Sequence, residues 1–172
     1  MSEPLRKKIF TDPEGKGDSD SFYHITRLRI PLFEVDLGQA LYHGNYYHLF
    51  ELGREDMLRT AGFPYREFIN RELHLTIVEA QCKYRKFLRY DDQIELYTQV
   101  TRMGRRSLSF SQLIYRPVAP PADGKAKGQG VELCTQCRLD MVCVQFTGRS
   151  TLLPDDFRQA IEGMQNNESV NR

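Results

Sequence analysis

The feature that most constrains the fold is a single helical segment placed between segments with the alternating pattern of β-strands. Across residues 44–61, apolar side chains recur at intervals of three and four, which predicts one amphipathic helix. Asn45 is positioned to cap its start, and Gly62 followed by Pro64 predicts its end. The apolar face of this helix consists of Tyr46, Phe50, Gly53, Met57 and Ala61.

Gly53 lies in the middle of the predicted helix, where glycine costs on the order of 1 kcal/mol relative to alanine. A close approach between the helix and a sheet would explain a residue without a side chain at this position. We therefore expect the helix to pack tightly on a sheet at Gly53.

Five segments predict β-strands. They cover residues 22–35, 73–84, 94–101, 108–114 and 131–146. The last four follow the helix, and most are joined by short turns, which favours an antiparallel sheet with the helix on one face. The fold class is therefore α+β. Because several strands carry apolar residues on both faces, we expect a second covering surface, such as a partner subunit.

Two further segments complete this prediction. Residues 117–130 are rich in Pro, Gly and Lys and predict a mobile hairpin loop. Residues 153–164 begin with Leu153, Pro154 and Asp155 and predict a short terminal helix.

Length, composition and charge exclude several classes of function. A chain of 172 residues, 40% of them hydrophobic, is expected to form one domain. The net charge of +1 gives no overall field for nucleic acid, and no apolar run reaches the roughly 18 residues of a membrane span. The polar segment 1–21 lacks a signal-peptide core, so we expect a flexible tail on a cytoplasmic protein. The domain is expected over residues 22–164, with a C-terminal tail at 165–172.

The four cysteines include a CxxC formed by Cys134 and Cys137. Alternation over residues 131–144 predicts a strand, in which residues three apart point to opposite faces and cannot bind one metal ion. No second CxxC and no nearby His completes a zinc site. We therefore expect structural, reduced thiols and no metal.

The start of the helix has an unusual composition. Residues 36–50 read DLGQALYHGNYYHLF, so an acid, a Gly-containing turn and a His come immediately before an aromatic run. FELGRE then supplies Glu51 and Arg54 on the helix. Farther along, VEAQCKYRKFLRYDDQIEL and RMGRRSLSF place basic turns between strands.

This ordered series resembles the hot-dog thioesterase superfamily, specifically its 4-hydroxybenzoyl-CoA thioesterase-like group of acyl-CoA thioesterases. The resemblance covers roughly residues 22–154. This chain departs from the family pattern in two places. The family often has an acid two residues before the Asp, and here that position is Glu34. The family normally has smaller residues or a second Gly after the Asp, whereas here Leu37 and Gln39 flank a single Gly38. The resemblance implies a curved antiparallel sheet wrapped around one long helix. It also implies homodimers or homotetramers formed edge to edge, with an acyl-CoA or acyl-carrier-protein thioester at the subunit interface and no cofactor.

Hydrolysis of a thioester needs an attacking group at the carbonyl carbon and hydrogen-bond donors for the oxyanion. Asp36 can act as general base or nucleophile. Backbone N–H groups near His43 and Gly44, at the positive end of the helix, can bind the oxyanion. The His43 side chain is expected to orient substrate or shuttle a proton. The predicted substrate-binding residues are Tyr42, Asn45, Tyr46, Glu51, Arg105 and Arg106.

Each of these residues also has a purely structural interpretation. Asp36 can close an Asx turn, and His43 can be a partly buried residue with its hydrogen bonds satisfied. Tyr46 can belong to the core. Glu51 and Arg54 can form a solvated pair on the helix. The arginines at 105 and 106 can bind the phosphates of coenzyme A or simply face solvent.

Three functions therefore remain open from the sequence. The first is an acyl-CoA thioesterase acting on a short-chain or aromatic acyl group. The second is a hydratase or dehydratase of the same fold. The third is a non-catalytic module that binds acyl thioesters or acyl-carrier protein.

Overall fold

The computed structural model describes residues 23–118 and 130–167. In chain order its elements are β1 (His24–Arg29), the short 3-10 helix η1 (Leu32–Glu34), α1 (Tyr46–Thr60), α2 (Arg66–Ile69), β2 (Leu73–Tyr84), β3 (Gln93–Met103), β4 (Ser107–Val118), β5 (Gly130–Gln145) and α3 (Asp155–Asn167). The predicted N-terminal tail and most of the predicted hairpin loop lie outside the described residues. So do residues 168–172 of the predicted C-terminal tail, whereas residues 165–167 belong to α3.

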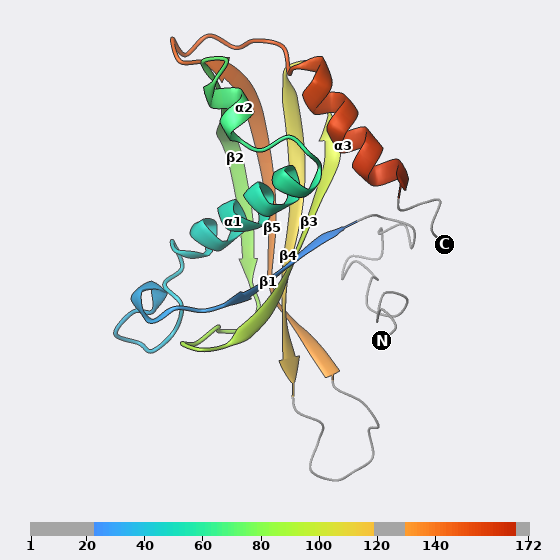
Figure 1. Cartoon of the computed structure of the whole chain (residues 1–172). Helices are drawn as coiled ribbons and strands as arrows, with labels where there is room; N and C mark the ends of the chain where they lie inside the picture. Colours follow the sequence, from blue (N-terminus) through green and yellow to red (C-terminus); the bar gives the residue numbers. More distant parts are fainter. Residues whose placement is uncertain (1–22, 119–129, 168–172) are drawn as a thin grey trace.

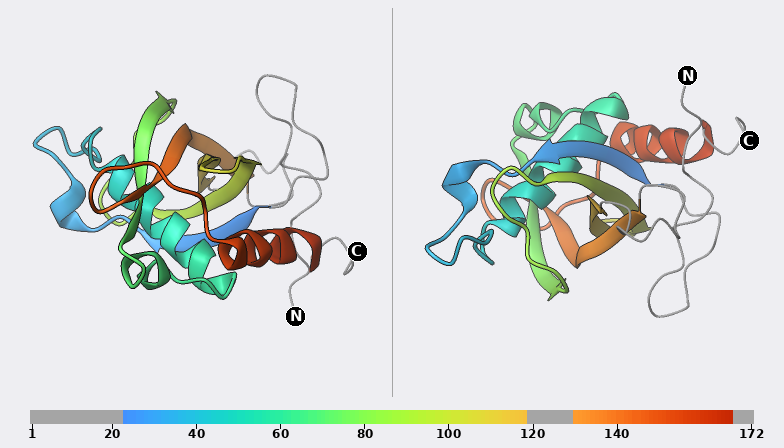
Figure 2. Two further views of the ribbon diagram at one scale, coloured as in Figure 1. Left: turned by 90° about the horizontal axis from the view of Figure 1, so that it is seen from above. Right: turned by 90° about the horizontal axis from the view of Figure 1, so that it is seen from below.

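The five strands form one antiparallel sheet in the order β1-β3-β4-β5-β2. The sheet curves around α1, which crosses its concave face, while α3 covers one end of the sheet (Figures 1 and 2). This confirms the predicted α+β architecture of one long helix against an antiparallel sheet. Strand β2 is an edge strand, paired only with β5 among the described strands.

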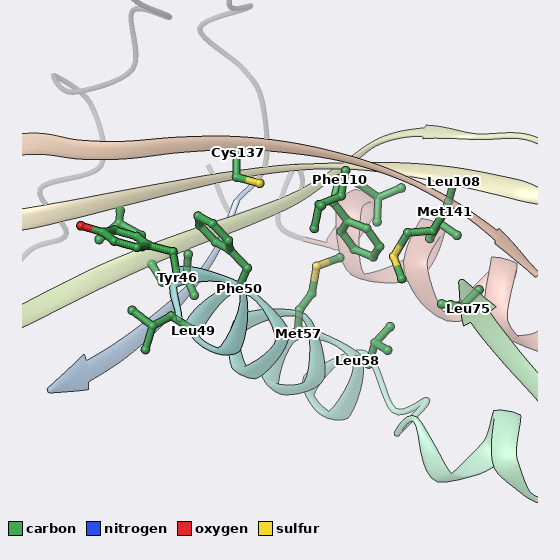
Figure 3. Close-up of a cluster of buried hydrophobic side chains, with 14 of the residues drawn as sticks. Tyr46, Leu49, Phe50, Met57, Leu58, Leu75, Leu108, Phe110, Cys137 and Met141 are labelled. Carbon is green, nitrogen blue, oxygen red and sulfur yellow. The ribbon is translucent and has the colours of Figure 1, made fainter. Parts of the chain in front are cut away.

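The main core lies between α1 and the sheet (Figure 3). Residues of α1 that are buried there are Tyr46, Leu49, Phe50, Gly53, Arg54, Met57 and Leu58. A Cβ atom at Gly53 would lie 2.4 Å from Leu96 Cδ2 and 2.9 Å from Thr98 Oγ1. The predicted close approach of helix and sheet at Gly53 is therefore confirmed.

The C-terminal end of α1 follows the sequence prediction. Gly62 adopts a positive φ of 80°, the left-handed conformation that glycine tolerates best. The amide of Phe63 then donates to the carbonyl of Leu58, and that of Gly62 to the carbonyl of Arg59, both at 3.0 Å. This pair of bonds is a Schellman motif, which satisfies carbonyls that the helix itself leaves free.

The N-terminal end of α1 differs from the prediction, because Asn45 makes no side-chain capping bond. Asn45 has helical backbone angles, and its amide Nδ2 instead donates to the carbonyl of Glu34 at 3.1 Å. The residue therefore anchors the preceding loop to the helix, a tertiary contact that outweighs its local capping tendency.

The first strand is also shorter than predicted, since β1 ends at Arg29 and η1 occupies residues 32–34. Pro31 separates the two elements, and a proline has no N–H to continue a ladder. The short helix α2 was not predicted, because four residues are too few for a periodic pattern.

The prediction that Cys134 and Cys137 face opposite sides of the sheet is wrong. Ile114 pairs with Thr135 while Tyr115 pairs with Leu133, so Cys134 forms a β-bulge without a partner on β4. Both thiols are consequently buried in the main core. The bulge also moves the residues before it to the outer face, where Val131 and Leu133 pack against a second cluster of Tyr97, Leu113 and Tyr115.

Two observations on the described residues bear on function. No group of three or more His, Cys, Asp or Glu side chains within them is arranged to hold a metal ion. In the same residues, no helix combines the length and the apolar character needed to cross a bilayer.

Candidate active site

A compact loop at residues 36–40 projects beside the start of α1 (Figure 1). It is closed by a bridge between Val35 and Leu41 and by a bond from Asp36 N to Ala40 O at 2.9 Å. Gln39, rather than Gly38, takes the left-handed conformation, with φ at 59°. Gly38 instead leaves room for the acid, because a Cβ atom there would lie 3.0 Å from Asp36 Oδ1.

The Asp36 carboxylate is exposed at the base of this loop. Its Oδ1 accepts a hydrogen bond from Gly38 N at 2.8 Å, which is the geometry of an Asx turn. This structural role does not exclude a chemical one. The turn uses one carboxylate oxygen and fixes the direction of the side chain, while Oδ2 makes no hydrogen bond within the described residues.

Glu34 ties this loop to α1. Its carboxylate is buried, and both oxygens lie 3.1 Å from His48 Nδ1. Its backbone carbonyl accepts from Tyr42 N at 3.0 Å as well as from the Asn45 side chain. In the sequence Glu34 stands out only as an acid near Asp36, and no local pattern marks His48, whose contact depends on the return of the loop.

The segment before α1 presents unbonded backbone donors. The N–H groups of His43, Gly44 and Tyr46 make no hydrogen bond to any part of the chain that the structure describes. They lie at the N-terminal end of α1, where the helix dipole places partial positive charge. A Cβ atom at Gly44 would lie 3.0 Å from the Tyr42 ring, so a glycine keeps that ring close to the backbone.

Strand β2 supports this helix start through its last residue. The hydroxyl of Tyr84 donates to the carbonyl of His43 at 2.9 Å. The rings of Tyr84 and Tyr46 pack edge to face, with 5.0 Å between their centroids. Burial, together with the neighbouring Cys82, raises the pKa of Tyr84, which keeps its hydroxyl protonated as a donor. Tyr46 itself is buried in the core, which agrees with its structural interpretation.

A cavity of about 300 Å³ opens between α1 and the first half of β2. Its polar lining includes Glu51, Arg54 and His74, and its apolar lining includes Leu58, Phe110 and Met141. This size is at the lower end of the range of ligand pockets, so the cavity suits a small group.

Arg54 is buried at this cavity and is held by the sheet. Its Nη1 donates to Gln112 Oε1 at 2.9 Å, while Gln112 Nε2 donates to the Phe50 carbonyl at 2.8 Å and to Thr98 Oγ1 at 3.0 Å. Burial lowers the pKa of Arg54. Glu51 is exposed and makes no ion pair with Arg54, so the solvated-pair interpretation of these two residues is wrong for Arg54.

Within one chain, the predicted site residues fall into separate groups. Asp36, Tyr42, His43, Gly44 and Asn45 gather at the start of α1, whereas the cavity lies farther along the helix. Arg54 lies nine positions after Asn45, which corresponds to a rise of about 14 Å in an α-helix.

The predicted phosphate-binding residues Arg105 and Arg106 lie at the other end of the sheet. Arg106 Nη1 donates to the carbonyl of Ser150 at 3.0 Å, and the carbonyl of Arg105 accepts from Leu153 N at 3.0 Å. On β5, Thr135 pairs with Tyr84 at the end of β2, and Val142 pairs with Ser107 at the start of β4. These two positions of β5 are roughly 23 Å apart along the strand. One chain therefore does not bring these arginines to the start of α1.

The comparisons with known proteins agree with this architecture. The family model of the thioesterase-like superfamily matches residues 30–161. A putative esterase of Aquifex aeolicus is 33% identical over 92 residues, which cover 54% of this chain and 72% of that protein. The acyl-CoA thioester hydrolase YbgC of Escherichia coli O157:H7 is 29% identical over 87 residues, which cover 51% of this chain and 65% of that protein.

Among solved structures, the 1,4-dihydroxy-2-naphthoyl-CoA (DHNA-CoA) thioesterase of Staphylococcus aureus superimposes with a TM-score of 0.71 at 22% identity. The match covers 87% of this chain and 95% of that one. At this identity the likeness concerns the fold, and it confirms the expected hot-dog arrangement. The family match over residues 30–161 establishes that the chain belongs to the thioesterase-like superfamily.

Proposed function

We propose that this protein is an acyl-CoA thioesterase that hydrolyses a small acyl thioester to the free acid and coenzyme A. Membership of the thioesterase-like superfamily supports a thioester hydrolase, and the E. coli relative is named for the same reaction. The observation that carries the proposal is the exposed Asp36 carboxylate in a loop beside the unbonded N–H groups at the start of α1.

The chemistry follows from these two groups. The carboxylate of Asp36 removes a proton from a water molecule that attacks the thioester carbon, or attacks that carbon itself. Negative charge then develops on the carbonyl oxygen, where the N–H groups near His43 and Gly44 stabilise it. Collapse of the tetrahedral intermediate breaks the carbon–sulfur bond, and the coenzyme A thiolate leaves and is protonated. The exposed imidazole of His43 lies beside the Tyr42 ring in a tilted arrangement, with ring centroids 4.3 Å apart, where it can orient the substrate or pass on that proton.

The cavity and the acid belong to the same site when two copies of the chain pair. The outer edge of β2 has no strand beside it in the described residues, and such an edge can pair with another strand. Antiparallel pairing of two β2 strands along their full length places Tyr84 of the second copy opposite Leu73. Because Tyr84 holds His43, the acid loop of the second copy then comes next to His74 at the cavity.

This arrangement explains why one chain alone separates the predicted residues. The acyl group would occupy the cavity of one copy, and Asp36 with the start of α1 would come from the other. Arg105 and Arg106 remain proposed phosphate contacts, which a larger assembly would have to bring to the site.

The reaction is proposed to need no cofactor, since water and a carboxylate supply both the nucleophile and the base. We also propose that the protein works in the cytoplasm. The free state of all four cysteines, which lie within the described residues, supports a reducing compartment.

The test is release of free thiol from a panel of acyl-CoA substrates by the wild type and by Asp36→Asn. Asparagine keeps the oxygen that accepts from Gly38 N, so the loop stays folded while the charge is lost. We expect the substitution to lower kcat by roughly 100-fold or more with little change in KM. Asp91→Asn, which removes an exposed acid on another turn, serves as the control and should retain full activity.

Two results would argue for the other functions. Conversion of enoyl-CoA without release of thiol would indicate a hydratase of the same fold. Binding of acyl-CoA without any turnover, unchanged in Asp36→Asn, would indicate a non-catalytic module.

A further inference from the structure

Two of the four cysteines face each other across the edge of the sheet. Cys82 on β2 and Cys137 on β5 are direct partners in the antiparallel register. Residues directly opposite each other share one face of a sheet. Accordingly, Cys137 is buried in the main core near Phe50 (Figure 3), and the half-buried Cys82 packs against the same core.

The hydrogen-bond pattern shows which kind of pair this is. The amide of Arg85 donates to the carbonyl of Cys134 at 2.8 Å, so these two positions form a hydrogen-bonded pair. Hydrogen-bonded and non-hydrogen-bonded pairs alternate along an antiparallel ladder. Three positions back, Cys82 and Cys137 are therefore a non-hydrogen-bonded pair. The Cα atoms of such pairs are about 4.5 Å apart, within the roughly 4.4–6.8 Å that a disulfide spans.

The two thiol groups also interact with each other. The neighbouring Cys137 thiol lowers the pKa of Cys82, and the interaction between the two thiols, together with burial, raises the pKa of Cys137. Cys82, which is closer to solvent, is therefore the sulfur that reacts first. The remaining cysteines have no such partner, because Cys143 lies opposite Leu75 and Cys134 lies at the bulge.

We propose that Cys82 and Cys137 are a thiol pair that closes reversibly to a cross-strand disulfide by exchange with a small-molecule disulfide. In the first step the Cys82 thiolate attacks one sulfur of the small disulfide, forms a mixed disulfide and releases one thiol. In the second step the Cys137 thiolate attacks the sulfur of Cys82 and releases the second thiol. The protein is oxidised by two electrons, the small disulfide is reduced, and the protons of Cys82 and Cys137 pass to the released thiols.

The bond would join the edge strand β2 covalently to its neighbour, two residues from the Tyr84 that holds the start of α1. The proposed cross-link thus lies beside the candidate active site, but its formation does not depend on the proposed activity.

The experiment exposes the folded, full-length wild type to oxidised glutathione, blocks the remaining thiols after unfolding, and analyses the protein by intact and peptide mass spectrometry. We expect the free thiols to fall from four to two. Before the remaining thiols are blocked, the mass should be lower than that of the reduced protein by two hydrogen atoms, and one cross-linked peptide should join Cys82 to Cys137. Addition of a dithiol reductant should restore all four thiols.

Cys82→Ser should abolish the cross-link, and the matched control Cys143→Ala should retain it, since Cys143 belongs to no pair. The wild type alone is enough to overturn the proposal. Four unmodified thiols in the folded protein, a disulfide between another pair, or glutathione that remains attached to Cys82 beside a free Cys137 would each do so.

Discussion

The hydroxyl of Tyr84 donates a hydrogen bond of 2.9 Å to the carbonyl of His43, so the last residue of β2 holds the segment that leads into α1. The two residues are 41 positions apart in the sequence. Their contact joins the edge strand of the sheet to the backbone donors of the candidate site.

Tyr84→Phe is therefore expected to destabilise the protein by about 0.5–1.5 kcal/mol, the usual net contribution of one hydrogen bond. The ring contact with Tyr46 remains, so the loss reports on the hydroxyl alone. Urea unfolding measures the effect. Tyr90→Phe is the control, because Tyr90 is exposed and has no hydrogen-bond partner among the described residues. Equal stability of the two variants would contradict the structural role of Tyr84.

Gly53→Ala should destabilise the protein even though alanine favours helices. The new Cβ would lie 2.4 Å from Leu96 Cδ2, and overpacking of this kind costs about 1–3 kcal/mol beyond any gain in helix propensity. Gly163→Ala on α3 is the matched control, because no atom of the described residues lies within 4 Å of its Cβ position. There, the same substitution should stabilise by up to about 1 kcal/mol. Thermal unfolding of both variants gives the comparison, and a stabilised Gly53→Ala would contradict the close packing of α1 on β3.

Ala80→Pro tests whether β2 forms the interface between two copies. Ala80 belongs to a non-hydrogen-bonded pair with Leu139 in the ladder to β5, so its N–H points to the free edge. Proline removes this N–H without breaking a bond to β5. We expect the wild type to be a dimer or larger in light scattering, and Ala80→Pro to be a folded monomer with little thioesterase activity.

Ala80→Ser, which keeps the N–H, is the control and should assemble as the wild type does. A wild-type chain that is monomeric and fully active would show that the site does not need a second copy.

Asp56 should contribute to stability in a pH-dependent way. Hydrogen bonds from His24, with 2.8 Å between Nε2 and Oδ2, and from Thr26 Oγ1 at 2.7 Å lower the pKa of this carboxyl. Because the pKa of Asp56 is lower in the folded protein than in the unfolded chain, its ionised carboxylate adds to the free energy of unfolding. This contribution is fully present above the ordinary Asp pKa of about 3.9 and is lost as the pH falls through the pKa of Asp56 in the folded protein. The stability difference between wild type and Asp56→Asn should therefore be present at pH 6 and shrink towards pH 3. Denaturant unfolding across this range measures it, with the exposed Glu162→Gln as control. A difference that stays constant with pH would mean that the ionised carboxylate adds nothing.

The sequence by itself determined the elements whose signals are local. A period of three to four residues marks α1, and Gly62 ends it, because both depend on backbone geometry within a few residues. Gly53 indicated the close approach to the sheet, since few other reasons favour glycine in mid-helix. The motif at residues 36–46 likewise predicted that the acid lies near the helix start, because only a short segment joins the two.

Only the tertiary structure decided the contacts between residues far apart in the chain. Asn45 bonds to Glu34 instead of capping α1, and Arg54 is buried against Gln112, 58 positions away. The bulge that brings Cys134 to the core depends on how β4 and β5 align. Alternation along one strand predicts which face of the sheet a side chain lies on only as long as the pairing with the neighbouring strand has no bulge. A side chain that could satisfy its hydrogen bonds locally takes a distant partner when burial removes it from water. These energies belong to the packed chain, and a single segment of sequence does not contain them.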